Sequence, residues 1–399
     1  MRTILLISRC PPYPAHLGDR LIIWHLAREL SKRGYIIDLL ALHDRAEDPQ
    51  NIHHYRAFFR QIQLIREPPR SSRDYLRRLL WPRARFAASP DASFCPALWR
   101  AIAKRLSRND YDLVHCFGSV AVYEFLPIFA HLPKLITPYE SYSLYLRSAA
   151  QQGDLRARVA LPLARRFERF MFTPFDRAVV LSDVDAAMLR RLQPVLRVEV
   201  VPNGIDLAQF RPGATNRNRN TLIFVGNFAY APNQDAARLL TAQVLPAVRA
   251  KLPETRLQLV GANPPGWMRA LANEHIEVTG RVPDVAPYLA RAAVFVCPLR
   301  IGAGLKNKVL EALAMGVAVV ATPLSVDGIA VRHQESAWLA PGEQLAGAVI
   351  RLLGDAALRA RLSQKGRELI EDGYTWARTA DAYERLYSAV CAETDASGG

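Results

Sequence analysis

Short apolar runs alternate with longer stretches of helical periodicity along almost the whole chain of 399 residues, and this alternation most constrains the fold. The pattern is typical of a parallel sheet covered by helices. Strands are predicted in the first half at 3–8, 36–42, 62–67, 112–117, 134–139, 178–183 and 198–204. They are predicted in the second half at 221–226, 256–261, 276–280, 294–299 and 317–322. The fold class is therefore expected to be α/β.

The length exceeds what one ordinary core accommodates, so two domains are expected. We assign residues 1–204 to an N-terminal Rossmann-like domain and 205–375 to a C-terminal one. The stretch 210–220 is polar and carries Gly, Pro and Asn, so it reads as the linker. Each doubly wound domain would present the carboxyl edge of its sheet to ligands.

The end of the chain is predicted to be a helix at 375–390 followed by a disordered tail at 393–399. We expect the segment 376–392 to pack back across the domain junction. Its Trp376 and Tyr383 stand at helical spacing, so both are predicted to be core residues.

No apolar run approaches the roughly 20 residues that cross a bilayer. The first run, 3–8, is too short for a signal-peptide core and is followed by Pro11 and Pro12. The five cysteines are scattered without metal-ligand spacing, and we expect them to be buried small hydrophobes in a reducing compartment. Together these features predict a cytoplasmic protein.

Positive charge is concentrated in the first half. The net charge is +15, and residues 51–108 hold 13 basic and 3 acidic side chains. The segment 74–86 interleaves leucines, Trp81 and Phe86 with arginines, a mixture suited to a lipid headgroup layer. We expect an anionic membrane surface to bind through 51–108, with the charges on Arg77, Arg78, Arg83 and Arg85 contributing. The alternative is a solvated basic helix that caps its own domain. A nucleic-acid partner is not expected, because the motifs of the usual RNA modules are missing.

The segment 298–322 carries the densest chemical signal. A predicted strand ends there, a loop with Gly302 and Gly304 follows, and a helix starts near Lys306. Glycines let a phosphate approach backbone N–H groups, and a helix N-terminus adds positive potential. Glu311 on the same helix could accept hydrogen bonds from both hydroxyls of a diol. The unit suits a nucleotide-diphosphate sugar, although a tight turn before a cationic helix would look the same.

The segment LKNKVLEALAMGVAVVAT (305–322) resembles the signature helix of glycosyltransferase family 4, whose members have the GT-B fold of two Rossmann-like domains facing across a cleft. VVPNGIDLAQFRP (200–212) resembles the family's segment between the domains, and FVGNFAYAPNQDA (224–236) the element after it. The pattern GNxxYxPN…KNKVLEA is similar to that of a subgroup linked to exopolysaccharide systems.

The resemblance implies a glycosyltransferase that moves a sugar from a nucleotide-diphosphate sugar to an acceptor hydroxyl, with retention and without a metal. It implies no cofactor, a donor of UDP or GDP type, and a lipid-linked or polysaccharide acceptor used in cell-surface glycan synthesis at the inner face of the plasma membrane. The implied donor-binding residues are Gly18, Gly226, Asn227, Arg281, Val282, Gly302, Ala303, Gly304, Leu305, Lys306, Asn307 and Glu311.

Two departures from the family pattern affect these expectations. The first of the usual pair of glutamates would stand at 303, where this chain has Ala303, so donor-sugar recognition must differ. The usual Arg and Lys after the first strand of the second domain are missing, because the chain reads Gly226-Asn227. Lys306 is then expected to neutralise the departing diphosphate, with Lys308 or Arg281 as alternatives that could assist it, and Lys306 is the candidate catalytic residue here.

Two further catalytic candidates lie in the first domain. Glu140 occupies the place of a His-Asp pair in relatives, and could orient a hydroxyl or merely cap the next segment. His115 is expected at the carboxyl edge of the sheet, where ligands gather, although a lone histidine is more often structural. Other functions weighed were a catalytically inactive nucleotide-sugar or polyanion-binding relative, a nucleotide-sugar epimerase and a phosphorylase.

Overall fold

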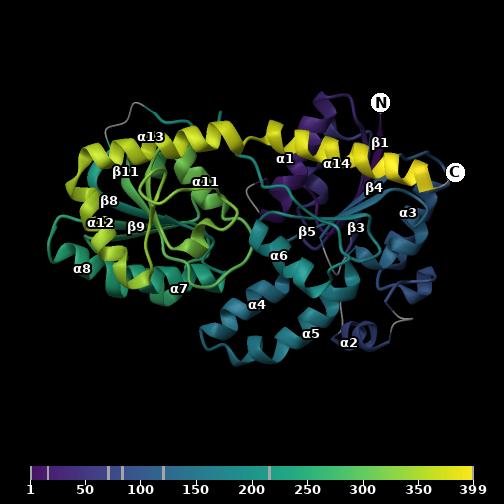
Figure 1. Cartoon of the computed structure of the whole chain (residues 1–399), viewed down its shortest axis with the longest axis horizontal. Coiled ribbons are helices and arrows are strands. Elements are labelled where there is room, and N and C mark those ends of the chain that lie inside the picture. Colours follow the sequence, from purple (N-terminus) through teal and green to yellow (C-terminus); the bar gives the residue numbers. More distant parts are fainter. Residues whose placement is uncertain are drawn as a thin grey trace. The chain divides into compact units, whose positions relative to one another are not determined.

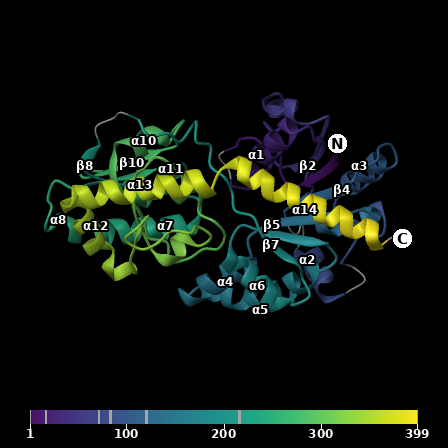
Figure 2. The ribbon, with the colours of Figure 1, turned by 45° about the horizontal axis from the view of Figure 1, so that its top comes forward.

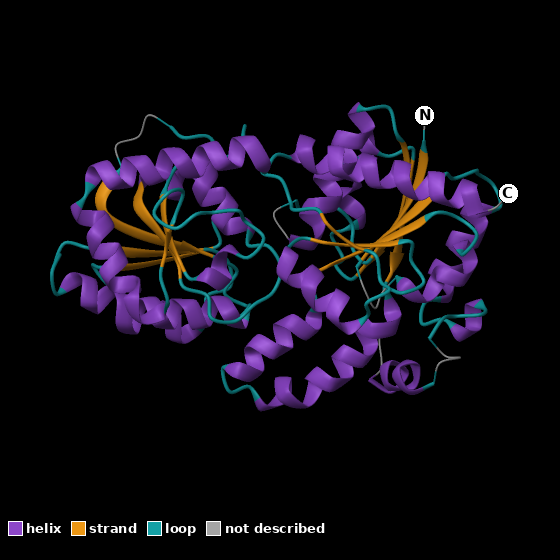
Figure 3. Ribbon diagram, viewed as in Figure 1, coloured by secondary structure: helices purple, strands orange, loops and turns teal. Residues whose placement is uncertain are grey.

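The computed structural model describes residues 2–15, 18–69, 72–81, 85–118, 122–213 and 217–397. The chain forms two compact units. Unit 1 comprises Met1–Arg147, Leu155–Pro202 and Trp376–Gly399, and unit 2 comprises Ser148–Asp154 and Asn203–Thr375. In each unit helices cover both faces of a sheet (Figure 3), which confirms the α/β class.

The sheet of unit 1 is wholly parallel. In spatial order its strands are β3 (Gln61–Arg66), β2 (Ile36–His43), β1 (Thr3–Ser8), β4 (Leu113–Phe117), β5 (Lys134–Tyr139), β6 (Arg177–Val180) and β7 (Val198–Val200). Strand order reverses between β1 and β4, as in Rossmann-like domains, and ligands bind such sheets at that switch point.

The helices of unit 1 connect these strands. They are α1 (Gly18–Lys32), α2 (Ser72–Leu80), α3 (Pro96–Leu106), α4 (Tyr142–Gln151, of which the last turn is grouped with unit 2), α5 (Leu155–Met171), α6 (Asp183–Leu192) and α14 (Trp376–Ser397). Short 3₁₀ segments are η1 (Pro49–His54), η2 (Arg56–Phe58), η4 (Pro90–Ala92) and η5 (Tyr123–Phe129). Helix α14 lies against α1, as Figures 1 and 2 show.

Helix α14 is bound into unit 1 by aromatic packing. The rings of His25 and Trp376 stack at 4.4 Å between centroids. Trp376 and Tyr383 are both buried, which confirms their prediction as core residues. On the rim of this contact, the guanidinium of Arg33 donates to the carbonyl of Ala377 at 2.9 Å. A helix distant in sequence thus completes the core of the first sheet.

The tail predicted to be disordered is helical as far as Ser397. Glu393 accepts from Arg177 at 2.5 Å and from Arg197 at 2.6 Å. The expectation of disorder is wrong for residues 393–397, which are helical and whose first residue, Glu393, is bound by two arginines far earlier in the chain, while residues 398 and 399 lie outside the described ranges.

The sheet of unit 2 is also parallel. In spatial order its strands are β10 (Ile276–Gly280), β9 (Arg256–Val260), β8 (Asn218–Val225), β11 (Ala292–Cys297), β12 (Ala318–Ala321) and β13 (Trp338–Leu339). Here the order reverses between β8 and β11. Both sheets therefore have the Rossmann-like order that the sequence predicts.

The helices of unit 2 are α7 (Ala231–Leu239), α8 (Leu245–Arg249), α9 (Gly266–Arg269), α10 (Ala286–Arg291), α11 (Asn307–Ala314), α12 (Leu345–Gly354) and α13 (Ala356–Gly373). The shorter segments are η6 (Leu240–Val244), η7 (Pro323–Val326) and η8 (Gly342–Gln344). Helix α13 packs on α11 and β12, so α11 lies between the sheet and a second helical layer.

The chain passes from unit 1 to unit 2 between Pro202 and Asn203, ahead of the polar stretch 210–220. The described part of that stretch belongs to unit 2, and its residues 214–216 lie outside the described ranges. Phe210 is buried, and Arg217 donates to the carbonyl of Met315 at 2.8 Å. The linker prediction is therefore wrong, because these contacts bind the stretch to the second core.

All five cysteines are free, and Cys10, Cys95, Cys116 and Cys297 are buried, as predicted. Cys391 is partly exposed. Among the helices that the structure describes, none is both long enough and apolar enough to cross a bilayer.

Candidate functional site

Most of the predicted donor residues lie at the switch point of unit 2, outside the carboxyl ends of β8 and β11. Gly226 and Asn227 directly follow β8, and the loop of Gly302 and Gly304 follows β11. Helix α11 begins at Asn307, immediately after that loop. One end of the sheet therefore presents two loops and a helix N-terminus at the place where open α/β sheets bind ligands.

The loop after β11 needs glycine at two positions. Gly302 and Gly304 have φ angles of 152° and 67°, which other residues rarely adopt. Two hydroxyls hold the strand end before the loop: Thr322 donates to the carbonyl of Leu299 at 2.7 Å, and Ser325 donates to that of Cys297 at 2.7 Å. These hydrogen bonds fix the position of the strand end from which the loop starts.

Lys306 stabilises this loop through hydrogen bonds to the loop carbonyls. Its side chain is buried, and its Nζ donates to the carbonyl of Ala303 at 3.1 Å and to that of Gly304. Part of its charge is therefore already bound by loop carbonyls. Whether it also neutralises a diphosphate stays a prediction.

Lys308 stands in the first turn of α11 and reaches toward β8. Its Nζ donates to Asn233 Oδ1 at 2.5 Å and lies 4.6 Å from the ring centroid of Phe224. Burial lowers the pKa of this lysine to about 8, partly opposed by Glu311. A cation at a helix N-terminus opposes the helix dipole, so the bare protein holds it at a cost that a bound anion would relieve.

Glu311 follows Lys308 by three residues, so the two side chains share one side of α11. Burial raises the pKa of this carboxyl to about 7, against the lowering effect of Lys308, and Asp284 adds to the rise. A carboxyl perturbed mainly by burial at a ligand-binding edge is a functional-site signature. Its oxygens can accept from two neighbouring hydroxyls.

Close packing explains the glycine at 226. A Cβ there would lie 2.9 Å from the side-chain carbon Cγ of Asn233 and 3.2 Å from Lys308 Nζ. The same Asn233 donates to the carbonyl of Asn227 at 2.8 Å. A Cβ on Gly261 would meet the carbonyl oxygen of Gly226 at 2.0 Å. Glycines thus allow the loop after β8 to lie directly over the Lys308 ammonium.

The other predicted donor residues surround this centre. Ala303 and Leu305 are buried within the loop, and the side chain of Asn307 accepts from Asn203 at 3.1 Å. Arg281 is exposed and Val282 partly buried at the carboxyl end of β10, two strands from β8. Their contact with a nucleotide base stays a prediction.

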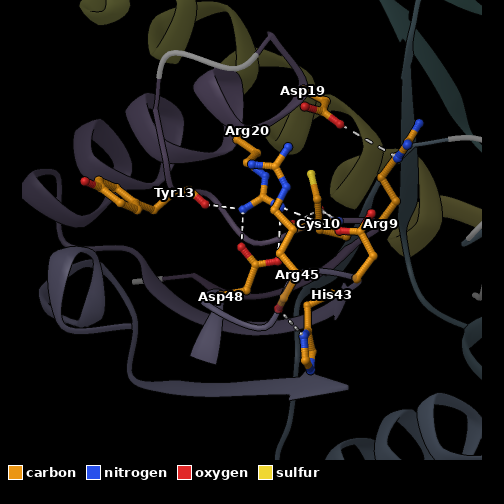
Figure 4. Close-up of polar contacts among 10 residues, drawn as sticks. Arg9, Cys10, Tyr13, Asp19, Arg20, His43, Arg45 and Asp48 are labelled. Carbon is orange, nitrogen blue, oxygen red and sulfur yellow. Dashed lines mark hydrogen bonds and ion pairs between the residues drawn. The ribbon is translucent and has the colours of Figure 1, made fainter. Parts of the chain in front are cut away.

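The switch point of unit 1 is formed by different residues, of which Figure 4 shows Arg9 and Asp19. Arg9 follows β1, and Gly118 follows β4 with a φ angle of 107°. A Cβ on Gly118 would lie 2.8 Å from Arg9 Cγ, so glycine lets the arginine lie across the strand end. Arg9 pairs with Asp19 of α1 at 3.8 Å and is about half exposed.

A buried ion pair supports the loop in front of α1. Arg20 donates to Asp48 at 2.5 and 3.1 Å and to the carbonyl of Tyr13, and both side chains are almost fully buried (Figure 4). The exposed Asp44 lies 4.0 Å from the same guanidinium. The pair ties the proline-rich loop to the segment after β2, which positions Gly18 at the start of α1.

Gly18 and Glu140 lie near this edge of the unit. Among the described residues, none has an atom within 4 Å of an added Cβ on Gly18, so packing within that part of the chain does not explain this glycine. Glu140 follows β5 and is partly buried. Its neighbour Tyr139 has a φ angle of 73° and donates to the carbonyl of Asp19 at 3.3 Å. Such a conformation is strained for tyrosine and clusters at functional sites.

His115 does not lie where the sequence placed it. It stands in the middle of β4, fully buried, with one ring nitrogen 2.8 Å from Tyr387 Oη and the other 2.8 Å from Thr137 Oγ1. Burial lowers its pKa to about 3, so it is neutral. The expected position at the sheet edge is wrong, because the polar network under α14 accounts for this histidine.

The basic segment 74–86 is only partly a surface feature. Arg78 pairs with the buried carboxylate of Glu124 and is 12% exposed, while Arg77 is exposed. The guanidinium of Arg85 lies 3.7 Å over the ring of Phe170. Arg78 therefore stabilises the fold, which corrects its assignment to a membrane contact. Arg83 lies outside the described residues.

Sequence reasoning assigned no role to Asn233, Arg9 or the strained Tyr139, and ranked Lys308 below Lys306. The spacing Lys308–Glu311 would have indicated one helical face, but Asn233 is 75 residues from Lys308 and meets it only through the fold. No local sequence feature predicts that Tyr139 has a positive φ angle.

Two family models match the chain. The one described as "Glycosyltransferase Family 4" matches residues 21–209, and the one described as "Glycosyl transferases group 1" matches residues 219–355. The second range contains the whole glycine loop and α11.

Curated relatives match across both units. A phosphatidyl-myo-inositol mannosyltransferase of Mycobacterium leprae is 31% identical over 314 residues, covering 74% of this chain and 78% of the relative. A GDP-mannose-dependent alpha-(1-6)-phosphatidylinositol monomannoside mannosyltransferase of Mycobacterium tuberculosis is 29% identical over 244 residues, covering 54% of this chain and 62% of the relative.

Solved structures share the fold. Sucrose-phosphate synthase from Thermosynechococcus elongatus has a TM-score of 0.77 at 21% identity, with 98% of this chain and 100% of that chain covered. Anabaena HepE in complex with UDP and glucose has a TM-score of 0.66 at 14% identity, with the same coverage.

Proposed function

The chain belongs to glycosyltransferase family 4 and is a glycosyltransferase with the GT-B fold, and on this premise we propose that it transfers a sugar from a nucleotide-diphosphate sugar, of UDP or GDP type, to a hydroxyl of a lipid-linked or polysaccharide acceptor. The proposed reaction retains the anomeric configuration, uses no metal and no cofactor, and serves cell-surface glycan synthesis at the cytoplasmic face of the membrane.

The observation that carries the proposal is the position of Glu311 and Lys308, both partly buried and both with shifted pKa values, beside a glycine loop. Glu311, with its pKa near 7, would accept from both ribose hydroxyls of the donor. The loop of Gly302 and Gly304 and the N-terminus of α11 would bind the diphosphate. Lys308 and Lys306 would supply positive charge as the nucleoside diphosphate departs.

The relatives support the donor and acceptor classes without choosing between the bases. One curated relative is named for GDP-mannose and for a phosphatidylinositol acceptor, and HepE is solved with UDP and glucose. We place the acceptor on unit 1, at the switch point of Arg9 and Gly118, with Glu140 orienting a hydroxyl. Arg9 is half exposed there, which suits an acceptor that carries phosphate.

Turnover of the donor by the purified protein tests the proposal. UDP- and GDP-hexoses are incubated with and without a polyprenyl-linked or phosphatidylinositol acceptor, and release of the nucleoside diphosphate is measured. We expect acceptor-stimulated release with one donor class, unchanged by EDTA, and a product with the anomeric configuration of the donor. Release that EDTA abolishes would contradict metal independence, and an inverted product would contradict retention.

The second candidate function, a catalytically inactive nucleotide-sugar binder, rests on Ala303, which replaces a carboxylate of the family pattern. Binding of a nucleotide sugar without turnover in the presence of every acceptor would favour it. Restoring the carboxylate with Ala303→Glu would then be expected to change donor-sugar preference and leave nucleotide affinity within about twofold, since the ribose contact lies at Glu311.

A further inference from the structure

Large apolar side chains are exposed on two neighbouring helices of unit 1. On α5, Leu155 is 69% exposed, Val159 75% and Leu163 39%. On and just after α2, the exposed fractions are 44% for Leu76, 53% for Leu80 and 60% for Trp81. We propose that these six residues, here termed the α2–α5 surface, insert into the headgroup layer of an anionic lipid bilayer. The proposal deepens the proposed function, on which it rests for the lipid-linked acceptor.

Helix α5 has apolar residues on two sides, and only one of these sides is buried in unit 1. Ala157, Ala164, Phe167 and Met171 are buried in unit 1. Leu155, Val159 and Leu163 follow one another at four-residue spacing, so they form a stripe on the exposed side. A helix of a globular domain normally keeps that side polar, and a contiguous exposed apolar patch marks an interaction site.

The charge around the stripe is predominantly positive, although the exposed Asp154 directly precedes Leu155. Helix α5 carries five exposed arginines: Arg156, Arg158, Arg165, Arg166 and Arg169. Its single acidic residue, Glu168, is buried and accepts from the backbone of Tyr142 at 2.6 Å and from Ser141 Oγ at 3.0 Å. Apolar side chains flanked by cations match a headgroup layer with negative phosphates.

Helix α2 extends the same region. It packs on α5, and the two helices are neighbours in both Figures 1 and 2. Arg166 Nε donates to the carbonyl of Leu79 at 3.3 Å, and Leu79 itself is buried. The inner side of α2 is thus held by Leu79 and by the Arg78–Glu124 pair, which leaves Leu76 and Leu80 outward.

The charge also favours lipid over a second copy of the chain. Two copies meeting through this surface would bring the arginines of one α5 near those of the other, and like-charge juxtaposition opposes association. An anionic bilayer neutralises the same arginines.

Co-sedimentation with vesicles tests the surface. The full-length protein is mixed with vesicles of phosphatidylcholine alone and with vesicles of equal parts phosphatidylcholine and phosphatidylglycerol. The test variant is Leu155→Glu/Val159→Glu, because glutamate keeps helical propensity while it adds negative charge. Val195→Glu is the matched control, since Val195 is 73% exposed and lies outside the surface.

We expect wild-type protein to bind the mixed vesicles more tightly than the neutral ones, and less tightly as salt rises. The double variant should lose at least about tenfold in affinity, and Val195→Glu should stay within about twofold. Trp81 should contribute a blue shift of fluorescence on binding that Trp81→Phe removes. Circular dichroism checks that each variant is folded.

Equal vesicle binding by the double variant and the wild type would overturn the proposal, as would wild-type protein that fails to bind the mixed vesicles. A wild-type dimer that the double variant dissociates, without vesicle binding, would show that the surface joins two copies instead. Donor turnover without vesicles should be the same in wild type and double variant, so failure of the surface is distinguishable from failure of the proposed function.

Discussion

The switch points of the two units use charge differently. In unit 2, Lys308 and Glu311 are held by burial with pKa values near 8 and 7. In unit 1, Arg20 and Asp48 form a close, buried pair, and Arg9 reaches Asp19 at 3.8 Å near the surface. The two sheets thus share a strand order but differ in their buried charges, which in unit 1 pair with each other to support a loop and in unit 2 flank the proposed donor site.

The comparison teaches that the way in which a buried charge is balanced separates the two uses better than charge alone, since the pKa values of Arg9 and Arg20 in unit 1 are shifted as well. A matched ion pair satisfies its own charges, and its removal should affect stability first. Burial brings the pKa values of Glu311 and Lys308 close to neutral pH, so substitution of either residue should affect ligand binding before it affects stability. The following substitutions test that separation, from the largest expected effect to the smallest.

Asp48→Ala should lower the free energy of unfolding by about 3–5 kcal/mol, because it leaves the buried Arg20 guanidinium without its carboxylate. Urea denaturation followed by circular dichroism measures the loss in the first transition. Asp44→Ala is the control, since Asp44 lies 4.0 Å from the same guanidinium but is 74% exposed. Equal, small losses in both variants would show that the pair does not support unit 1.

Gly261→Ala should destabilise unit 2 by about 1–3 kcal/mol. Its φ angle is 141°, and a Cβ there would lie 2.0 Å from the carbonyl oxygen of Gly226. Donor affinity, measured by calorimetry, should fall with it, because the loop over Lys308 must move. Gly266→Ala, where a Cβ meets no atom within 4 Å, should change neither quantity. Full donor affinity in Gly261→Ala would show that this loop is not part of the site.

Glu311→Gln should stabilise the protein above neutral pH, by at least about 1 kcal/mol. The folded pKa of about 7 exceeds the ordinary 4.5, so the folded state holds more protons between these values. Stability of the wild type therefore falls as pH rises from 4.5 through 7, and the variant escapes that loss. Thermal unfolding at pH 5 and pH 8 measures the difference. A gap that does not widen toward pH 8 would contradict the raised pKa.

Gly18→Ala should leave the free energy of unfolding within about 0.5 kcal/mol of wild type, because the added Cβ has no atom of the residues described by the structure within 4 Å. Turnover should nevertheless fall if a diphosphate approaches this backbone. Comparing thermal unfolding with the KM for donor separates the two. Unchanged turnover would remove Gly18 from the site.

Much of the fold follows from the sequence, because buried parallel strands are continuous apolar runs with polar ends. The predicted strands 3–8, 134–139 and 276–280 match β1, β5 and β10 residue for residue. Helix α5 was not predicted, since two apolar sides and an internal proline obscure its periodicity. The helical order of the terminal tail could not be predicted, because Glu393 is bound by Arg177 and Arg197, which are 216 and 196 positions away in the sequence.

The proposed donor site was more predictable than the proposed acceptor side for a physical reason. Gly302, Gly304, Lys308 and Glu311 lie within ten residues, so one loop and one helix place them. At the switch point of unit 1, Arg9, Asp19, Gly118 and Tyr139 come from four separate segments that only the sheet brings together. His115 shows the same limit: its partner Tyr387 is 272 residues away.

Calorimetric titration of UDP and GDP into wild-type protein and Glu311→Gln tests the central claim most directly. If Glu311 binds the ribose hydroxyls, the variant should lose about 10- to 100-fold in nucleotide affinity at pH 8, because an amide cannot accept from both hydroxyls as a carboxylate does. Wild-type affinity should also fall as pH drops below about 7, where the carboxyl is protonated. Equal affinity of the two proteins at pH 8, with no pH dependence in the wild type, would contradict the account.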